Sequence, residues 1–530
     1  MNNGERFIEH FATDAFEQEE FNVGHRPEKP SDLRALLGRA SRKPAIQSSN
    51  RLETELYKGP IPSDPIELVN IMPAENANVF HPRDEAFTAV FRSLLLYGFI
   101  LYLFAFTAPD LLFGVGTAEA DTSSAAGNLF SQLIVPAMFF AACSLVHVYR
   151  ISARRLWRAL APMAPFLLVV MLSALWSEYP ELTIRRASNE LLQATALALL
   201  AACFSNATAM LAALFRAFLI IGCLDLLSYA FFPESITDLG FAGIHGGKNI
   251  AGEFFVVALP VYLLGTLDKE ISGNRLLGLF SLISGIAMLV ATQSKTSVGA
   301  AVFGFSLLLL ARALSRNHTL RVSLLLCFLL GLLCAIAVTI SLGPSELLET
   351  LIGDPTLTGR DQIWRFAISK FDGDPVLGVG YGAIWQVGLE IQLALRSMGL
   401  YFVFNEAHDG YLEIAAQLGI VGVACLLIFL VRTLLNSLSY WATIEKNSLL
   451  GAGALTTYIF WALVLSNITE SLYFQAGVGS SGVLIFLGAF VASPHRRLVI
   501  VSPVGRSKSP GYGHLKLPHL MIAGSAAEQR

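Results

Sequence analysis

Apolar runs long enough to cross a bilayer follow one another along most of this chain, from about residue 86 onward. A transmembrane helix needs about 20 predominantly apolar residues. Charged residues make up only 15% of the sequence, whereas soluble domains carry about a quarter. We therefore expect an all-α polytopic membrane protein. About twelve transmembrane helices are expected, near residues 93–113, 129–149, 157–176, 184–204, 209–231, 249–267, 274–293, 297–314, 320–342, 412–433, 449–467 and 474–493.

The two ends of the sequence are polar and contrast with the middle. Residues 1–85 are rich in Pro, Glu, Asp, Arg and Ser without sustained periodicity, which predicts a disordered cytoplasmic arm rather than a signal peptide. Residues 86–493 form the expected transmembrane domain, and residues 494–530 a basic cytoplasmic tail. The six cysteines fall inside apolar runs, so the sequence predicts neither a disulfide framework nor a cysteine-based metal site.

Lysine and arginine side chains indicate the orientation, because cytoplasmic connections of membrane proteins retain more of them than external ones. With the N-terminus inside, the inner connections carry eleven of these residues. The short outer connections carry four, which are Arg185, Arg186, Lys248 and Lys295. We therefore expect both termini in the cytoplasm and one large loop, residues 343–411, on the outer side.

The outer loop is unusually long for a connection between apolar runs, and such loops are typically functional or disordered. It contains three motifs, Leu357–Trp364, Pro375–Trp385 and Glu406–Glu413, which bring an arginine, a glycine-rich turn and a histidine into one connection. Its aromatic and aliphatic content favours order. The glycines follow no Rossmann strand, so a dinucleotide site is not indicated.

Further polar side chains accompany the four outer cations on the same side of the membrane. Each has a structural explanation when taken alone, such as an interfacial arginine anchor or a histidine in a tight turn. Cations gathered at one end of a helical bundle call for an anionic partner, and guanidinium groups match phosphate oxygens bidentately. The coincidence on one face favours a site for the diphosphate of a lipid carrier. These further side chains are His245, Asn249, Arg360, His408, Asn467 and Glu470.

Six segments resemble those of the O-antigen ligase and polymerase family of bacterial envelope proteins. They are Trp176–Arg186, His245–Asn249, Ser294–Ser297, Leu357–Trp364, Pro375–Trp385 and His408–Gly422. The resemblance is strongest to the exopolysaccharide polymerase type and covers about residues 172–422. It implies a GT-C-type glycosyltransferase architecture in the bacterial inner membrane, with the large loop and the active face in the periplasm. It also implies a reaction without metal or cofactor, and the sequence offers no HExxH or Cys/His spacing for a metal.

By this resemblance we expect a polymerase that transfers a glycan from undecaprenyl diphosphate to an acceptor sugar of an exopolysaccharide or O-antigen. An O-antigen ligase, which transfers the glycan to lipid A-core, is the alternative that the sequence leaves open. The expected partners are the undecaprenyl-diphosphate-linked oligosaccharide, the acceptor glycan or lipid A-core, membrane lipids and other polysaccharide assembly proteins. The net charge of -3 gives no indication of nucleic-acid binding.

The expected reaction is a direct displacement with inversion. His408 accepts the proton of the attacking hydroxyl, since a neutral imidazole is a suitable base near pH 7; Glu406 and Asp409 are the alternative bases. Arg360 stabilises the charge that develops on the diphosphate as the anomeric bond breaks. Asp409 stands where the family commonly has asparagine, and one of the other site residues, Lys295, where arginine is frequent. The further residues expected to bind substrate are Arg185, Arg186, His245, Lys248, Asn249, Lys295 and Tyr411.

Two other classes of protein fit parts of this sequence. A transporter or lipid flippase with twelve helices would use buried charges near the bilayer midplane, for which Glu190 and Asp225 are candidates. The polar motifs instead cluster at the outer ends of the apolar runs, and the two halves show no repeat. A non-catalytic subunit of a polysaccharide assembly complex is the third possibility, and a His408→Ala strain that still assembles the complex tests it.

Overall fold

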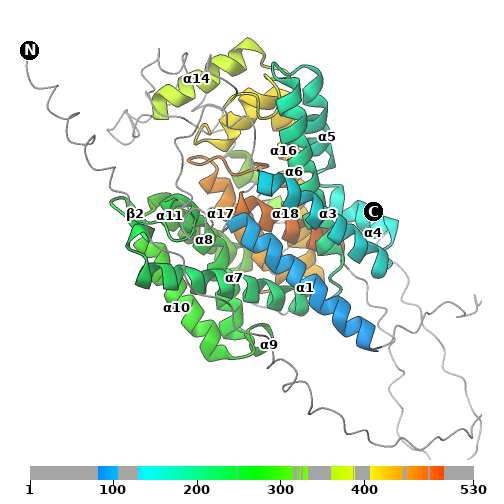
Figure 1. Cartoon of the computed structure of the whole chain (residues 1–530), viewed down its shortest axis with the longest axis vertical. Coiled ribbons are helices and arrows are strands. Elements are labelled where there is room, and N and C mark those ends of the chain that lie inside the picture. Colours follow the sequence, from blue (N-terminus) through cyan, green and yellow to red (C-terminus); the bar gives the residue numbers. More distant parts are fainter. Residues whose placement is uncertain are drawn as a thin grey trace, which may run out of the picture. The chain divides into compact units, whose positions relative to one another are not determined.

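The computed structural model describes residues 82–104, 129–245, 247–313, 360–385, 406–445, 450–475 and 478–494, with residues 319, 322–323, 326–331 and 387. The predicted arm and basic tail lie almost wholly outside these residues. Within them the chain is built mostly of helices (Figure 1). The longer helices are α1 (Pro82–Phe104), α3 (Leu129–Val148), α4 (Ala153–Leu160), α5 (Ala164–Leu172), α6 (Pro180–Ala202), α7 (Ala207–Phe231), α8 (Lys248–Leu267), α10 (Arg275–Ala291), α11 (Lys295–Ala313), α14 (Arg360–Gly373), α16 (Gly410–Thr443), α17 (Ala452–Ser466) and α18 (Gly479–Ala492).

Short elements connect these helices. The described residues are mostly helical, as expected, and add one small element, a two-stranded antiparallel hairpin of β1 (Ile236–Thr237) and β2 (Gly240–Phe241) between α7 and α8. Gly240 has a φ of +133°, and a Cβ there would lie 2.2 Å from the carbonyl oxygen of Thr292. Glycine is therefore required where the hairpin meets the end of α10. The remaining short elements are η2 (Ser173–Leu175), η3 (Pro233–Ser235) and α9 (Lys269–Ser272).

Helices α17 and α18 are buried along almost their whole length. Both are apolar all round, and nearly every residue of each is buried, as is typical of helices enclosed by other helices. Helix α17 packs against α11, α16 and α18, and α18 also packs against α6 (Figure 1). The polar residues that follow α17 are consequently attached to the most enclosed part of the described chain.

Five of the described helices are long and apolar enough to cross a membrane, namely α1, α7, α8, α11 and α16, and the bent pair of α4 and α5 makes up to six. Helices α3, α10, α17 and α18 coincide with predicted spans but are shorter apolar helices. Helix α6 carries Glu181, Arg185, Arg186 and Glu190 in its first half. The predicted span at 320–342 lies mostly outside the described residues. The structure thus indicates a polytopic membrane protein, and the number twelve stays a prediction.

The predicted span at 157–176 is wrong as a single straight helix. Helices α4 and α5 occupy this region and meet at an angle of 70°. Pro165 lies in the first turn of α5, where its missing N–H leaves no hydrogen bond unmade. In a helix continued from α4 the ring of Pro165 would clash with the carbonyl of Ala161, four residues earlier, so α5 begins as a separate helix. Arg154 and Arg158 therefore belong to a separate basic helix.

Helix α16 is broken at Gly419, where the backbone is non-helical with φ 61° and ψ −162°. The segment Pro375–Gly380 of the glycine-rich motif lies beside this break and pairs with it, main chain to main chain. The backbone groups that the break frees thereby find partners inside the protein, as they must in or near a membrane. The four hydrogen bonds run from Ile420 N to Pro375 O (2.9 Å), Val421 N to Val376 O (3.2 Å), Val379 N to Ala416 O (3.2 Å) and Gly380 N to Gln417 O (2.9 Å).

The close approach of these two backbones explains glycines on both sides. Gly378 has a φ of +68°, and a Cβ there would lie 2.4 Å from the carbonyl carbon of Gln417. A Cβ on Gly419 would lie 2.2 Å from the carbonyl oxygen of Val376. The glycine pattern of this motif therefore serves the packing of one main chain on another.

Candidate active site

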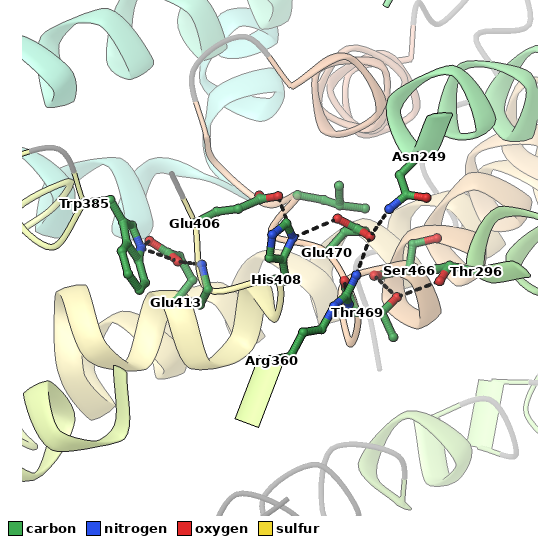
Figure 2. A network of polar contacts seen from close by, with 12 residues as sticks. Asn249, Thr296, Arg360, Trp385, Glu406, His408, Glu413, Ser466, Thr469 and Glu470 are labelled. Carbon is green, nitrogen blue, oxygen red and sulfur yellow. Dashed lines mark hydrogen bonds and ion pairs between the residues drawn. The ribbon is translucent and has the colours of Figure 1, made fainter. Parts of the chain in front are cut away.

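Glu470 is the centre of a polar network in the turn that follows α17 (Figure 2). Its Oε1 accepts hydrogen bonds from Asn249 Nδ2 at 2.7 Å and from Arg360 Nη2 at 3.2 Å. Its Oε2 lies 3.3 Å from His408 Nδ1. The carboxylate is nearly buried, with 7% of the side chain exposed. The structure thus brings Asn249, Arg360 and His408 together on one acidic residue that the sequence placed on the same outer face without giving it a role in catalysis or substrate binding.

His408 has a left-handed backbone, with a φ of 52°. Such a conformation is uncommon outside glycine and persists where the surroundings impose it. Here the following residue is Asp409, whose Oδ1 accepts from the amides of Tyr411 (2.9 Å) and Leu412 (3.0 Å) and caps α16. Gly410 has no room for a side chain, because a Cβ would lie 2.0 Å from Asn467 Oδ1. The sequence around His408 therefore fixes its position at the start of α16.

The imidazole of His408 lies between two carboxylates. Besides Glu470, Glu406 Oε1 lies 3.0 Å from Nδ1. The hydrogen bond to Glu406, and then the one to Glu470, raises the pKa of His408 to about 9, against the lowering effect of burial. The ring is consequently an imidazolium at neutral pH. This contradicts the expectation that His408 is neutral near pH 7.

Asp409 is less suited to the role of alternative base than the sequence suggested. Its carboxylate faces the amides of its own helix, and burial raises its pKa to about 7 in spite of those two hydrogen bonds. A side chain that caps a helix stabilises it by about 1 kcal/mol. Asp409 thus has a structural task, and Glu406 is the carboxylate that faces His408 with about a quarter of its side chain exposed.

Arg360 begins α14 and is held by the same turn as Glu470. Its Nη1 donates to the carbonyl of Thr469, whose hydroxyl donates to Thr296 Oγ1 at 3.2 Å (Figure 2). Trp364, one turn further along α14, donates its indole N–H to the carbonyl of Ala407 at 3.0 Å. Helix α14 is therefore attached at two points to the residues that surround His408.

Glu413 ties the glycine-rich motif to the segment that carries His408. Its carboxylate accepts from Trp385 Nε1 at 2.8 Å, from the amide of Ala407 at 2.6 Å and from Gln417 Nε2 (Figure 2). Gln417 Oε1 in turn accepts from the amide of Gly382 at 2.8 Å. A buried carboxylate needs such a set of donors. Together they fix the wall of the site on the side of α16.

Arg186, one of the predicted diphosphate ligands, binds the backbone of the glycine-rich motif. Its Nη1 donates to the carbonyl oxygens of Gly382 and, at 2.9 Å, of Trp385. A Cβ on Gly382 would lie 2.6 Å from Arg186 Cδ, so glycine makes room for this side chain. Arg186 thus connects α6 to the loop, and Arg185 beside it is half-buried.

The two predicted lysines lie at the starts of helices. Lys248 begins α8, and its Nζ donates to the carbonyl of Leu239 in the hairpin at 3.1 Å. Lys295 begins α11 and is exposed. Neither lysine makes a hydrogen bond to Glu470 among the described residues. Ser294, which precedes Lys295, donates to Asn249 Oδ1 at 3.1 Å and so links α11 to the network.

His245 and Tyr411 lie in the protein interior instead of in this network. His245 is buried, with Nδ1 2.5 Å from the carbonyl of Phe104 and Nε2 2.9 Å from Asp225 Oδ2. Tyr411 is buried as well, and its hydroxyl donates to the carbonyl of Val464 at 2.9 Å. Both side chains thus join helices to one another in this structure, and their binding of substrate stays a prediction.

The buried acids that suggested a transporter have different surroundings. Asp225 is paired with His245 and also accepts from the amide of Ile244 at 3.3 Å. Glu190 is buried on α6, and its Oε2 has no hydrogen-bond partner among the described residues. The Asp225 pair therefore has the arrangement of an interior structural contact between α7 and the segment that precedes α8.

Three side chains of the network have the donor atoms for a metal. Each of Glu406, His408 and Glu470 offers one possible ligand atom, and these three atoms lie within 4.8 Å of one another. A metal there would displace the proton on His408 Nδ1 and share Glu470 with the guanidinium of Arg360. Among the described residues, the guanidinium of Arg360 and the imidazolium of His408 already lie beside these carboxylates. Chelation is the experiment that decides whether the protein also needs a metal cation.

The sequence placed Glu470 in the final outer turn, among the polar side chains of the outer face, without assigning it a catalytic or substrate-binding role. The signal that would have identified it is its charge, since it is an acidic residue at the end of an apolar run on the side where the other short turns are basic. The contact with His408 spans 62 positions and that with Asn249 spans 221. Spacing in the sequence therefore gave no indication of it.

Two comparisons with known proteins bear on this site. Residues 280–427 match the family described as O-antigen ligase. This range includes Lys295, Arg360, His408 and Tyr411, and it ends before Glu470. The chain is also 26% identical over 304 residues to an exopolysaccharide production protein, ExoQ, of Rhizobium meliloti (strain 1021). That alignment covers 54% of this chain and 66% of the relative's length, slightly less than two thirds.

Proposed function

We propose that this chain is a membrane glycosyltransferase that extends a polysaccharide. The proposal is supported by the match of residues 280–427 to the O-antigen ligase family and by the similarity to an exopolysaccharide production protein. The donor is a glycan linked to undecaprenyl diphosphate, and the acceptor is a hydroxyl of another lipid-linked glycan. The reaction takes place at the periplasmic face of the bacterial inner membrane. The proposal includes the GT-C-type architecture, about twelve transmembrane helices and the catalytic role of residues 86–493.

The observation that carries this proposal is the meeting of His408 and Arg360 on Glu470. A proton-accepting group and a guanidinium that can bind phosphate oxygens are thereby held side by side at one end of the helices. Transfer from a sugar diphosphate needs these two functions together. One group receives the proton of the attacking hydroxyl, and the other stabilises the departing diphosphate.

The starts of three helices give independent support for an anionic substrate. Helices α8, α11 and α14 begin at Lys248, Lys295 and Arg360, and no acidic residue lies in the first turn of α8 or α11. The positive end of a helix dipole favours anions, and cations there lower the stability of the helix by a few tenths of a kcal/mol or more. A bound diphosphate would turn this unfavourable arrangement into a favourable one, since helix N-termini bind phosphate groups.

The proposed step is a single displacement. The acceptor oxygen forms a bond to the anomeric carbon while the bond from that carbon to the diphosphate oxygen breaks, and the electron pair leaves with undecaprenyl diphosphate. The hydroxyl proton passes to His408 Nε2, which has no hydrogen-bond partner among the described residues. Inversion at the anomeric carbon follows. Arg360, with Arg185, Lys248 and Lys295, binds the leaving diphosphate.

The titration of His408 sets a condition on this step. With a pKa of about 9 the ring must first lose its proton, so only a minor fraction is competent near pH 7. Glu406, whose Oε1 lies 3.0 Å from Nδ1, is the alternative base if His408 stays charged throughout and contributes as a cation.

A polymerase is favoured over a ligase by the name of the relative, which is an exopolysaccharide production protein. The description of the matching family favours the second candidate, an O-antigen ligase that transfers the glycan to lipid A-core. Reconstitution of the full-length protein with an undecaprenyl-diphosphate oligosaccharide separates them. A ladder of products on the same lipid supports the polymerase, and a single transfer to added lipid A-core supports the ligase. Absence of both products, with donor bound, argues against either.

The proposed roles of Arg360 and His408 predict different effects of their removal on donor binding and on turnover. We expect Arg360→Ala to weaken donor binding by about 10- to 100-fold, because a hydrogen bond to a charged group is lost. Arg360→Lys recovers only part, since the ammonium keeps the charge without the planar fork. His408→Ala lowers turnover by about 10²- to 10⁴-fold with donor affinity nearly unchanged. The matched control is Arg365→Ala, an exposed arginine on the same helix.

Two results would reverse these assignments. If His408→Ala abolishes donor binding while Arg360→Ala leaves it intact, the sides of the site are exchanged. Chelator gives the other check on the same reaction mixture. We expect activity to survive it, and loss of activity that added divalent cation restores would assign Glu406, His408 and Glu470 to a metal.

A further inference from the structure

Glu470 lies between the two halves of the proposed reaction. One carboxylate oxygen faces Arg360 and Asn249, and the other faces His408 (Figure 2). The turn that carries it is fixed by main-chain contacts, since the amide of Gly410 lies 3.1 Å from the carbonyl oxygen of Glu470 and 2.9 Å from that of Asn467. The main chain of Glu470 is therefore bonded to the first residue of α16.

We propose that Glu470 is a positioning residue that holds the imidazole of His408 and the guanidinium of Arg360 in one geometry, so that proton acceptance and diphosphate binding are coupled. This inference rests on the proposed function. A carboxylate that accepts from Nδ1 of a histidine fixes the ring and directs the other nitrogen, Nε2, toward its substrate. Here the same carboxylate also orients a cation, which joins the acceptor side to the donor side.

Glu470 is better placed for this role than Glu406, although Glu406 lies closer to Nδ1. Glu406 has 26% of its side chain exposed. Among the described residues, His408 is the one polar partner of its carboxylate. Glu470 has 7% exposed and three partners from three different segments. A side chain locked by several partners preserves a geometry that a partly exposed one does not.

The charged groups around His408 determine what loss of Glu470 does. Glu406 faces the ring directly, and Arg360 faces it across Glu470. Asp409 is turned toward the amides of α16. Glu253 lies one turn further along α8 than Asn249, is buried, and accepts from Ser480 Oγ at 3.1 Å. Of these groups, Glu406 remains as an acceptor for Nδ1 when Glu470 loses its charge, so the effect is partial.

The test measures His408 directly in the full-length protein in lipid nanodiscs. Diethyl pyrocarbonate modifies neutral imidazole, and mass spectrometry of the peptide carrying His408 gives the extent of modification at each pH. We expect the midpoint of the wild type near pH 9. In Glu470→Gln the midpoint falls by about one pH unit or more, because an adjacent opposite charge is worth 1–3 units. Glu470→Asp, which keeps the charge, falls by less.

The matched control is Glu445→Gln, at the opposite end of α17. Glu445 accepts from the amides of Ala452 (2.8 Å) and Gly453 (2.9 Å), so it caps the helix without contacting His408. We expect its midpoint to equal that of the wild type. A folded Glu470→Gln protein with an unchanged midpoint overturns the proposal, as does an equal fall in Glu445→Gln. If Glu470→Gln does not fold, the midpoint of Glu470→Asp is compared with that of Glu445→Gln instead. A larger fall of the midpoint in Glu445→Gln than in Glu470→Asp contradicts a local effect of Glu470.

Turnover gives the second readout and separates this inference from the function on which it rests. In Glu470→Gln we expect a rise in KM for the donor together with a fall in kcat of about 10- to 100-fold, the size typical of a lost supporting contact. The pH of half-maximal rate moves down with the midpoint. If Glu470→Gln lowers the midpoint but the wild-type protein transfers no glycan, the proposed function alone is refuted. Normal transfer with no shift refutes the positioning role alone.

Discussion

His408 is the residue whose chemistry depends most on its neighbours. Its ordinary pKa is about 6.5, and Glu406 followed by Glu470 raises the pKa to about 9. The sign for stability follows: this ion pair stabilises the fold fully below about pH 6.5 and is lost as the pH rises through about 9. For activity the sign is opposite, because the proton acceptor is the deprotonated ring.

We therefore predict that kcat/KM rises with pH about tenfold per unit from pH 6.5 and levels off near pH 9, since it reports groups of the free enzyme. The initial rate of donor consumption, measured in buffers of constant ionic strength, checks this. In His408→Ala the slope disappears with most of the rate. A flat profile between pH 6 and 8 in the wild type would show that His408 acts as a cation and that Glu406 is the better candidate for the base.

The sequence could indicate residue types at this site more easily than their arrangement. Arg360, Asn249 and His408 are polar residues in outer segments, and the structure brings all three to Glu470. The charge state of His408 depends on two carboxylates, one of which is 62 positions away. A local sequence pattern does not contain this information. For the same reason the sequence did not show that Arg186 binds carbonyl oxygens nearly 200 positions away.

At the scale of elements, the break in α16 is the feature that the length of an apolar run cannot predict. The predicted run at 412–433 passes through Gly419 without interruption, because a single glycine changes hydropathy little. The break exists only because Pro375–Gly380 supplies partners for the freed backbone groups. Runs that need no distant partner were predicted closely, as 209–231 and 249–267 show against α7 (Ala207–Phe231) and α8 (Lys248–Leu267).

We predict that Gly378→Ala lowers the free energy of unfolding by about 1–2 kcal/mol or more, which is the cost of left-handed backbone for a residue with a side chain. The clash with the backbone at Gln417 adds to it. Thermal unfolding of the detergent-solubilised protein measures the change. Gly373→Ala is the control, because a Cβ there would meet nothing within 4 Å. Equal stability of both variants would mean that the motif does not dock on α16 as described.

At the scale of the whole molecule, the orientation in the membrane connects the site to its substrate. The proposed site lies near the starts of α8, α11, α14 and α16, and the outer face is its expected location. In a cysteine-free background we predict that Asp372→Cys is labelled by an impermeant thiol reagent in intact cells with a permeabilised outer membrane. Arg154→Cys, on α4, is labelled only after lysis. The reverse pattern would place the site on the cytoplasmic side and remove the periplasmic donor from the proposal.

The pairing of Pro375–Gly380 with α16 has a consequence for how such proteins diverge. The bonds that hold this segment use amides and carbonyls, which every residue type but proline possesses in full. Glycines 378 and 419 are constrained by space, whereas Val376, with 55% of its side chain exposed, is not. Mutations at such positions can accumulate along a lineage without shifting the register of the segment. The side chains beside the proposed site can thus change while the backbone pairing that holds the segment is retained.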